Sequence, residues 1–270
     1  MPIRRSALAP EKPKPKIPEL VKDIIRISDI VLEVLDARFI QETRNKELEE
    51  FVRNLGKKII FVLNKKDLVD MKQKAQEIIG MDLKPYFFIS ARKRLGIAKL
   101  RRMIKIEAKR LKSERKRVNI GIIGYPNTGK SSLINILTGK SSAKTGADAG
   151  FTKGLQYIRL TAGIRILDTP GVLPESEYSS SDPEAIKKQS KLGGRTINTI
   201  RDPEMVVTGL MESHAKEIEK YYGIHAGGDA EVLIENLGRK KRFLKKGGLV
   251  DEDRAAKFII RDWQKGRIRI

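Results

Sequence analysis

The segment Gly124-Tyr-Pro-Asn-Thr-Gly129-Lys130-Ser131 has the residue types and spacing of a loop that binds nucleotide phosphates. Its glycines allow successive backbone N–H groups to turn toward an anion, and the helix that follows adds the positive end of its dipole. We expect Lys130 to reach the outer phosphates and the Ser131 hydroxyl to bind Mg²⁺. An ordinary glycine-rich connection is the alternative. The remaining nucleotide contacts expected here come from Asn127, Thr128, Gly129 and Ser132.

Two shorter patterns downstream would complete a site for a magnesium–triphosphate complex. Asp168-Thr169-Pro170-Gly171 follows a strand-like run, as expected of a carboxylate that orients the metal shell and a glycine whose N–H senses the γ-phosphate. Thr152 is the candidate loop threonine that caps the metal, and Thr145 is the alternative. We therefore expect the catalytic residues to be Lys130, Thr152, Asp168 and Gly171, with Mg²⁺ held by Ser131, Thr152 and Asp168.

Residues upstream of this loop have the chemistry to select guanine. Asn64-Lys65-Lys66-Asp67 and Ser90-Ala91-Arg92 each follow a strand-like run. The Asp67 carboxylate can accept hydrogen bonds from N1–H and the exocyclic amine of guanine, whereas adenine offers no matching donors. We expect Asn64 to assist at the base edge, the Lys65 stem to cover its face, and the Ala91 N–H to donate to O6. An ordinary loop with an ion pair is the alternative. The pattern predicts GTP and GDP as ligands.

These residues require a scaffold in which strands and helices alternate. The strand-like runs are Ile30–Leu35, Lys58–Leu63, Tyr86–Ile89, Val118–Ile123, Leu155–Leu160 and Gly163–Leu167, the last two forming a hairpin. Helical patterns cover Arg44–Leu55, Asp70–Ile79, Ser131–Leu137 and Gly96 to about Lys112. Strands buried on both faces and separated by helices predict a doubly wound, mostly parallel α/β sheet of six strands.

The strand patterns stop after about residue 176, and helical patterns dominate beyond Arg201. Asp182-Pro183 is typical of a helix start, and Ala256, Ile259, Ile260 and Trp263 repeat at helical spacing. We expect three parts. They are a basic, proline-rich arm at 1–18, the α/β domain at 19–198, and a small all-helical basic domain at 199–270.

The charge balance indicates a polyanionic partner. The 270 residues include 56 Lys and Arg against 34 Asp and Glu, a net charge of +22. Residues 92–117 carry 13 basic and 2 acidic side chains, and residues 238–270 carry 12 and 4. Such runs favour contact with phosphate backbones. The low aromatic content of 6% argues against recognition by stacking on bases, and favours recognition of the backbone and shape of structured RNA. A solvated helix face and a membrane surface are the weaker alternatives.

Cysteine and long apolar runs are both missing from the sequence. The lack of cysteine excludes disulfides, thiolate metal sites and cysteine nucleophiles, and is typical of a reducing compartment. No apolar run approaches the roughly 18 residues of a membrane span, and no apolar leader is present at the N-terminus. We therefore expect a cytoplasmic location, with neither a membrane nor DNA as partner.

The order of these motifs, with the guanine-reading residues before the phosphate loop, resembles that of circularly permuted GTPases. The sequence is similar to the RbgA/YlqF-like group of ribosome-biogenesis GTPases. The segments that carry the likeness are Asp36-Ala37-Arg38, Thr43-Arg44-Asn45, Thr152-Lys153-Gly154-x-Gln156, and the pattern from Leu237-Gly238 to Asp262. The resemblance implies a GTP-binding and GTP-hydrolysing factor that binds rRNA and assists assembly of the large ribosomal subunit. We expect it to act as a monomer.

The resemblance also bears on how water is activated. Val172 stands where Ras-like enzymes have a water-positioning glutamine. Related enzymes use a histidine from elsewhere or a potassium ion held by a phosphate-loop asparagine, and Asn127 resembles that potassium ligand. The Gly-His-Met-type segment of the family is missing, and we expect His214 and His225 to be structural or at the surface. Slow basal turnover, stimulated by potassium and a ribosomal partner, is therefore expected.

Two alternatives to this function remain open. One is a GTP-gated RNA-binding module with little hydrolysis, and the other is a GTPase directed at tRNA. In each case the permutation connects the switch at Asp168–Gly171 directly to the C-terminal domain. We therefore expect the nucleotide state to control how that domain is held.

Overall fold

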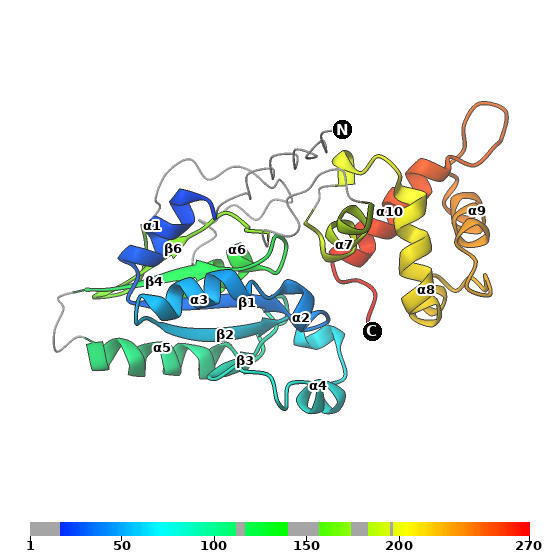
Figure 1. Ribbon diagram of the computed structural model, residues 1–270. Coiled ribbons are helices and arrows are strands. Elements are labelled where there is room, and N and C mark those ends of the chain that lie inside the picture. Colours follow the sequence, from blue (N-terminus) through cyan, green and yellow to red (C-terminus); the bar gives the residue numbers. More distant parts are fainter. Residues whose placement is uncertain (1–16, 112–116, 140–156, 174–182, 195–196) are drawn as a thin grey trace, which may run out of the picture.

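The computed structural model describes residues 17–111, 117–139, 157–173, 183–194 and 197–270 (Figure 1). These residues form a sheet domain (described residues 17–173) and a helical unit (described residues 183–270). The arm up to residue 16 and the candidate switch threonines Thr145 and Thr152 lie outside the described residues. Within the described part of the chain, every helix is too short or too polar to cross a membrane.

The sheet has six strands, as predicted, and their order is β3-β2-β1-β4-β6-β5. All neighbouring strands are parallel except β5 and β6, which form the expected antiparallel hairpin. The strands are β1 (Ile30–Asp36), β2 (Lys58–Asn64), β3 (Tyr86–Phe88), β4 (Val118–Ile123), β5 (Tyr157–Thr161) and β6 (Ile164–Asp168). Strands β1, β2 and β6 each continue one residue past their apolar run. Their last residues still belong to the sheet, because Asp36 pairs with Asn64 and Asp168 pairs with Ile122.

Helices cover both faces of the sheet. They are α1 (Glu19–Ile27), α2 (Ile40–Thr43), α3 (Lys46–Asn54), α4 (Met71–Glu77), α5 (Ile97–Leu111) and α6 (Lys130–Thr138), with a short 3-10 turn η1 (Lys66–Leu68). The helix expected from Arg44 begins two residues later, because the Asn45 side chain accepts from the Leu48 N–H and caps it. In α5 the apolar residues Ile97, Leu100, Ile104 and Ala108 are buried, and the lysines of this helix are exposed.

The strand residues alternate between two cores, as the pleat of a sheet requires. Ile30, Leu32 and Val34 point with Ile120 and Ile122 toward α5 and α6. Val31 and Leu35 point to the opposite side, where α1 and α3 supply further apolar side chains. Both faces of the central strands are therefore dry, which holds their carboxyl ends in fixed positions.

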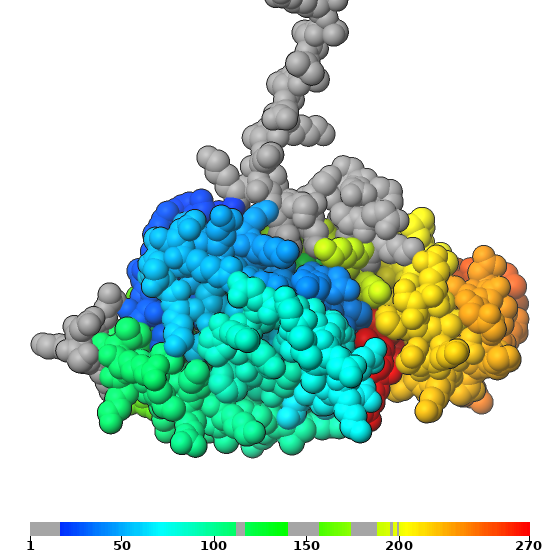
Figure 2. Space-filling view, turned by 60° about the horizontal axis from the view of Figure 1, so that its bottom comes forward, coloured from blue at the N-terminus to red at the C-terminus, as the bar shows by residue number. Residues whose placement is uncertain are grey.

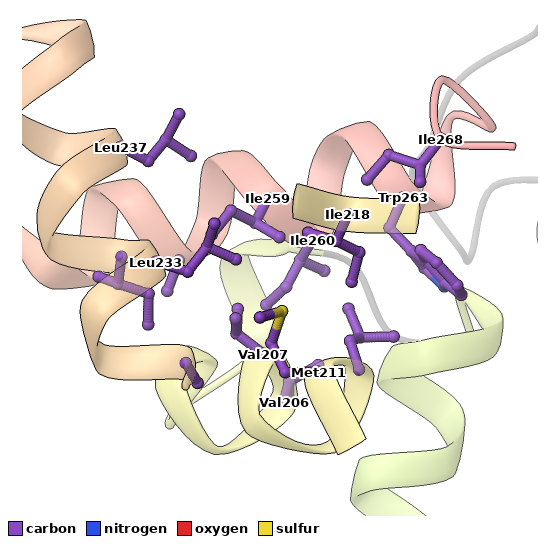
Figure 3. Close-up of a cluster of buried hydrophobic side chains, with 14 of the residues drawn as sticks. Val206, Val207, Met211, Ile218, Leu233, Leu237, Ile259, Ile260, Trp263 and Ile268 are labelled. Atoms are coloured by element: carbon purple, nitrogen blue, oxygen red, sulfur yellow. The ribbon is translucent and has the colours of Figure 1, made fainter. Parts of the chain in front are cut away.

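The helical unit contains α7 (Pro183–Leu192), a 3-10 turn η3 (Ile197–Thr199), α8 (Pro203–Tyr222), α9 (Ala230–Lys241) and α10 (Glu252–Gln264). Its core joins Val207 and Met211 of α8, Leu233 of α9, and Ile260 and Trp263 of α10 (Figure 3). Helix α7 packs on α8 and α10, and its Leu192 belongs to the same core. The domain boundary at residue 198 stays a prediction.

The helical unit lies beyond the carboxyl ends of the strands (Figure 1). Figure 2 shows the last residues, in red, between the sheet domain and helices α8 and α9. Two side chains of the sheet domain, Phe39 and Tyr125, are buried in the core of the helical unit. The Arg38 Nη1 donates to the Trp263 carbonyl oxygen at 3.0 Å. Apolar packing and hydrogen bonding therefore both cross the junction.

Candidate nucleotide site

The predicted site residues follow the carboxyl ends of neighbouring parallel strands. Asn64 ends β2, Ala91 follows β3, the phosphate loop follows β4, and Asp168 ends β6. The crossover direction changes between β1 and β4, and ligands of open α/β sheets bind at such a switch point. The topology therefore brings together residues that lie up to about a hundred positions apart in the chain.

Two glycines of the phosphate loop are required by close approaches of the backbone. Gly124 has φ 146°, and a Cβ there would lie 2.4 Å from the Val34 carbonyl oxygen. Gly129 has φ 99°, and a Cβ there would lie 2.2 Å from Nδ2 of Asn64. Helix α6 begins at the next residue, Lys130. The loop therefore lies directly against β1 and against the first residue of the guanine-reading motif.

Lys130 is buried within the phosphate loop. Its Nζ donates to the carbonyl oxygens of Gly124 at 3.0 Å and of Tyr125 at 2.8 Å. Burial lowers its pKa to about 8, and the nearby Asp168 carboxylate opposes that shift. The ammonium group is thus held inside the phosphate loop, in surroundings that would favour an added negative charge.

Asp168 carries a buried carboxylate oxygen that suits a cation. Its Oδ1 has no hydrogen-bond partner among the described residues. Burial raises its pKa, while Lys130 and the Thr169 backbone oppose the shift. Thr169 anchors the following turn by donating from Oγ1 to the Ile122 carbonyl oxygen at 2.5 Å. The residue predicted to orient Mg²⁺ therefore has the donor atom that such a role needs.

The segment after Asp168 crosses the phosphate loop. A Cβ on Gly171 would lie 2.8 Å from the Pro126 Cα, so this glycine is pressed against the loop. The next residue, Val172, donates its N–H to the Gly124 carbonyl oxygen at 3.2 Å, and its side chain is buried in the core beside α1 and α3. Val172 therefore does not point into the site, in line with the expectation that it cannot orient water.

Asn64 joins the phosphate loop to the loop that follows β3. Its Nδ2 donates to the Thr128 carbonyl oxygen at 2.8 Å, and its Oδ1 accepts from the Ala91 N–H at 2.9 Å. The Thr128 side chain is used inside the loop, where Oγ1 donates to the Tyr125 carbonyl oxygen at 2.9 Å. Because the Ala91 N–H is donated to Asn64, the predicted bond to guanine O6 would have to share this donor. That bond stays a prediction.

Lys65 and Asp67 lie on the turn after β2. Lys65 adopts a left-handed backbone conformation, with φ 65°, and its Nζ lies 2.7 Å from Oδ2 of Asp36. The same carboxylate pairs with Arg38 at 2.8 Å. Although burial opposes ionisation of Asp36, the charges of Arg38 and Lys65 hold its pKa well below the usual range. Asp67 is partly buried, and its carboxylate forms no hydrogen bond or ion pair with another described side chain.

Contacts from the C-terminal residues reach this turn, and the sequence patterns did not predict them. The Ile270 N–H donates to the Leu68 carbonyl oxygen at 3.0 Å, one residue after Asp67. A Cβ on Gly266 would lie 2.4 Å from Cδ1 of Leu68. Arg92 is exposed, and its Nη1 donates to the Gly266 carbonyl oxygen at 3.4 Å. The guanine-reading turn is thus packed against the end of the helical unit.

A second unpredicted contact lies on the phosphate side. Asn127, whose φ is 58°, donates from Nδ2 to the Gly193 carbonyl oxygen at 2.6 Å. A Cβ on Gly194 would lie 2.8 Å from the Tyr125 hydroxyl oxygen, so the loop and the end of α7 are in contact. Tyr125 occupies a variable position of the phosphate-loop pattern, and its burial gives no signal in the sequence.

The other predicted residues are placed as follows. Ser90 is buried, and its Oγ accepts from the Lys93 N–H at 3.0 Å, which shapes the turn that contains Ala91. Ser131 and Ser132 occupy the first turn of α6 and are partly buried. His214 packs against Trp263, with ring centroids 4.9 Å apart, and His225 is exposed beside Glu219. The two histidines are thus structural and at the surface, as expected.

Sequence comparisons place these features in a family. A family model described as "50S ribosome-binding GTPase" matches residues 119–232. An uncharacterized GTP-binding protein from Methanocaldococcus jannaschii is 41% identical over 257 residues, which make up 94% of this chain and 66% of the relative. Nucleolar GTP-binding protein 2 from Saccharomyces cerevisiae is 35% identical over 256 residues, with 93% of this chain and 51% of that protein covered. The chain thus spans about half to two thirds of the length of these relatives.

Structural comparisons agree with the sequence matches. GNP-bound YlqF from T. maritima aligns with a TM-score of 0.63 and 27% identity, over 93% of this chain and 95% of that one. GDP-bound YlqF aligns with a TM-score of 0.62 and 25% identity, over 93% and 96%. In the present chain, the guanine-reading turn on β2 precedes the phosphate loop on β4. Sequence, fold and motif order together show that the chain belongs to the YlqF-like family of circularly permuted GTPases.

Proposed function

We propose that the protein binds GTP and GDP with Mg²⁺ and hydrolyses GTP. The observation that carries this proposal is the pair of hydrogen bonds made by Asn64, to the Thr128 carbonyl and from the Ala91 N–H. They fix the distance between a phosphate-binding loop and a base-reading loop. A site so built suits one ligand that has both an anionic chain and a base.

Guanine is the base that the turn after β2 would select. Asp67 is a carboxylate acceptor that would face two adjacent donors of guanine, N1–H and the exocyclic amine. Adenine would leave this acceptor unsatisfied, and an unsatisfied buried acceptor costs roughly 1–3 kcal/mol. The Lys65 stem would cover the base face. Its ammonium group is held away from the base by the Asp36 carboxylate, 2.7 Å from Nζ.

The phosphate end would use Lys130, Ser131 and Asp168. Bound Mg²⁺ would neutralise charge on the phosphate oxygens, and Ser131 and Asp168 would hold it, with Thr152 joining them when triphosphate is present. Lys130 would exchange its bonds to the Gly124 and Tyr125 carbonyls for bonds to phosphate oxygens. The Gly171 N–H would report whether a γ-phosphate is present.

Hydrolysis would be slow without a further group to position water. Val172 is buried in an apolar core, so it would contribute no polar atom to the site. We propose that a potassium ion held by Asn127 supplies this function, and that a ribosomal partner increases the rate. The Asn127 Nδ2 is bonded to Gly193, so the side-chain oxygen is the atom that would face the ion.

The partner that we propose is rRNA in the large ribosomal subunit, during its assembly in the cytoplasm, with the protein acting as a monomer. The names of the relatives support this, because they include a 50S ribosome-binding GTPase family and a nucleolar GTP-binding protein. The charge supports it too. Residues 92–117 and 238–270 hold most of the net charge of +22, and Lys99, Arg102, Lys105, Lys109, Lys245 and Lys246 are exposed.

The nucleotide state would act on the helical unit through the contacts between them. Asn127 and Tyr125 of the phosphate loop touch the end of α7, and Leu68 of the base-reading turn touches the last residues. A loop that reorganises around a triphosphate would change these contacts. We propose that GTP thereby sets the position of the basic helical surface that meets RNA.

Nucleotide-dependent sedimentation with isolated large subunits tests this function. The protein should co-sediment more strongly with a non-hydrolysable GTP analogue than with GDP, and Asp67→Asn should lose the difference. Equal sedimentation in both nucleotide states would contradict the coupling. Single-turnover GTPase assays with and without subunits separate the enzyme from the RNA-binding module with little hydrolysis. Crosslinking to tRNA rather than to subunits would support the tRNA-directed alternative.

A further inference from the structure

The hairpin β5–β6 carries arginines on a face that is mostly apolar on β1 and β2. Ile158 of β5 and Ile164 and Ile166 of β6 point toward α6 and belong to one core. Successive strand residues point to opposite faces, so Tyr157, Arg159 and Arg165 occupy the other face. On β1 and β2 that same face carries apolar side chains and the buried Glu33, and it is packed under helices. The change in residue type therefore marks a surface built for a different neighbour.

On this face the end of α1 covers β4. A Cβ on Gly121 of β4 would meet Oγ of Ser28 at 2.4 Å and Cγ2 of Ile24 at 3.6 Å, so the end of α1 lies directly over this strand. Helix α6 packs on β5 and β6 from the opposite face. The arginine-bearing face therefore begins where the cover of α1 ends.

These arginines line a hollow of about 670 Å³. Its described lining consists of Arg117, Tyr157, Arg159, Thr161, Arg165 and the turn 162–163. Arg159 lies directly opposite Arg165 in the ladder, an arrangement of like charges that destabilises a strand pair. Among the described residues, neither arginine forms an ion pair, and the Arg165 guanidinium lies 5.5 Å above the Tyr157 ring. An anion in the hollow would relieve the repulsion.

We propose that this hollow binds the phosphate backbone of structured RNA, and this assignment rests on the proposed function. Guanidinium groups form paired, planar hydrogen bonds with phosphate oxygens, and three of them converge here from two strands and the start of β4. The polar Thr161 side chain and the exposed edge of Tyr157 suit the sugar and base of the same chain. The partner class is thus RNA with a continuous backbone.

The hollow is separate from the nucleotide site. Arg117 precedes β4 and the turn 162–163 precedes β6, so the hollow lies at the amino ends of these strands. Asp168 lies at the opposite end of β6, three residues after Arg165 and about 10 Å away by the rise of a strand. The protein would therefore hold RNA on a surface distant from the helical unit as well as on that unit.

Binding of a fluorescent RNA duplex of about 20 base pairs, measured over a range of KCl concentrations, tests the assignment. The double variant Arg159→Ala, Arg165→Ala should lower the slope of log affinity against log salt by about 2, and the affinity itself by about tenfold or more at 0.1 M salt. Its GDP affinity should stay unchanged. Arg159→Lys, Arg165→Lys should keep most of the slope, because both charges remain.

The matched control is Arg26→Ala, Arg53→Ala, which makes the same change in net charge. Those arginines belong to α1 and α3, outside the lining of the hollow, and pair with Glu19, Asp23, Glu49 and Asp82, so RNA binding should be unchanged. An unchanged salt slope for the Arg159 and Arg165 variant would overturn the site while leaving the proposed function intact. That result would instead fit arginines that merely keep an edge strand from pairing with other sheets.

Two further outcomes separate the assignment from the proposed function. If the unaltered protein bound no RNA, both the RNA partner and this surface would be overturned. Inorganic phosphate, added at the phosphate concentration of the duplex, should not compete with RNA for the hollow. Competition at that concentration would show a site for a free anion and would overturn the assignment to a continuous backbone.

Discussion

The side-chain amide of Asn127 donates a hydrogen bond of 2.6 Å to the carbonyl oxygen of Gly193, and so ties the phosphate loop to the end of α7. This relationship assigns two tasks to one side chain, because the amide nitrogen holds the helical unit and the amide oxygen is the proposed potassium ligand. A cation or nucleotide that reorients the side chain would therefore also act on α7. The phosphate loop and the domain junction thus share this side-chain amide.

The first prediction concerns potassium. Asn127→Ala should abolish the stimulation of GTP turnover by KCl over NaCl, because the proposed ligand is removed. The rate in KCl should fall by about tenfold or more, toward the rate in NaCl, since the loss of one group that stabilises developing charge is typically that large. Initial rates in the two salts check this. A variant that still responds to potassium would contradict the role of Asn127.

The second prediction concerns the base. Asp67→Asn replaces an acceptor with an amide that can donate, so the match to guanine N1–H and its amine is lost. GDP affinity should fall by about tenfold or more, the loss expected when a buried donor is left unpaired. Xanthosine diphosphate has a carbonyl in place of the amine, so its affinity should rise. Titration with both diphosphates checks this change of base preference. An equal loss of affinity for both would instead point to misfolding of the turn.

The third prediction concerns pH. Lys130 has a pKa of about 8 without nucleotide, and only its charged form attracts phosphate. Bound phosphate would raise this pKa, so binding takes up a proton at higher pH. GDP affinity should thus be flat below about pH 8 and fall by up to about tenfold per pH unit above it. Lys130→Gln should bind more weakly and show no such slope. A slope that survives in this variant would exclude Lys130 as its source.

The fourth prediction concerns stability in acid. Burial, with Lys191 nearby, lowers the pKa of His214 to about 4, below the 6.5 of an unfolded chain. The unfolded state therefore binds the proton more readily, and stability is lost as the pH falls from about 6.5 toward 4. We expect a loss of about 1 kcal/mol between pH 7 and pH 5 after allowing for partial exposure. Chemical denaturation at pH 7 and pH 5 measures this loss. The unaltered protein should show it, and the His214→Gln variant should not.

The sheet and the nucleotide residues were predictable because both depend on local patterns. Apolar runs mark buried strands, and a parallel sheet must place the residues after Leu63, Ile89 and Ile123 at one edge. The junction was not predictable. Arg38 and Trp263 are 225 positions apart, and neither a period nor a motif relates them. The positions of Tyr125 and Phe39 are likewise set by the shape of the other unit, which no local pattern encodes.

The hairpin shows the same limit on a smaller scale. The run Leu155–Leu160 predicts a strand, but a charged residue on a strand is expected to face solvent wherever it occurs. Only the register, with Arg159 opposite Arg165, reveals that two cations share one place. The dense basic runs of the sequence lie at 92–117 and 238–270, and Arg159 and Arg165 belong to neither. Two charged residues can lie opposite each other on neighbouring strands without being part of a dense run of charges in the sequence.

The last prediction tests the contact between the C-terminal residues and the base-reading turn. Gly266 and Gly227 have nearly the same left-handed backbone, with φ 63° and 62°. A Cβ on Gly266 would lie 2.4 Å from Cδ1 of Leu68, whereas one on Gly227 would meet nothing within 4 Å. Both alanine variants should lose about 1 kcal/mol of stability from backbone strain.

The two variants should differ in nucleotide binding. In Gly266→Ala the Leu68 side chain must move, and the adjacent Asp67 moves with the turn, so GDP affinity should fall by about threefold, or roughly 0.6 kcal/mol. In Gly227→Ala the turn is untouched, so GDP affinity should match that of the unaltered protein. Calorimetric titration with GDP measures both. Equal affinities in the two variants would mean that the C-terminal contact holds the helical unit in place without acting on the guanine site.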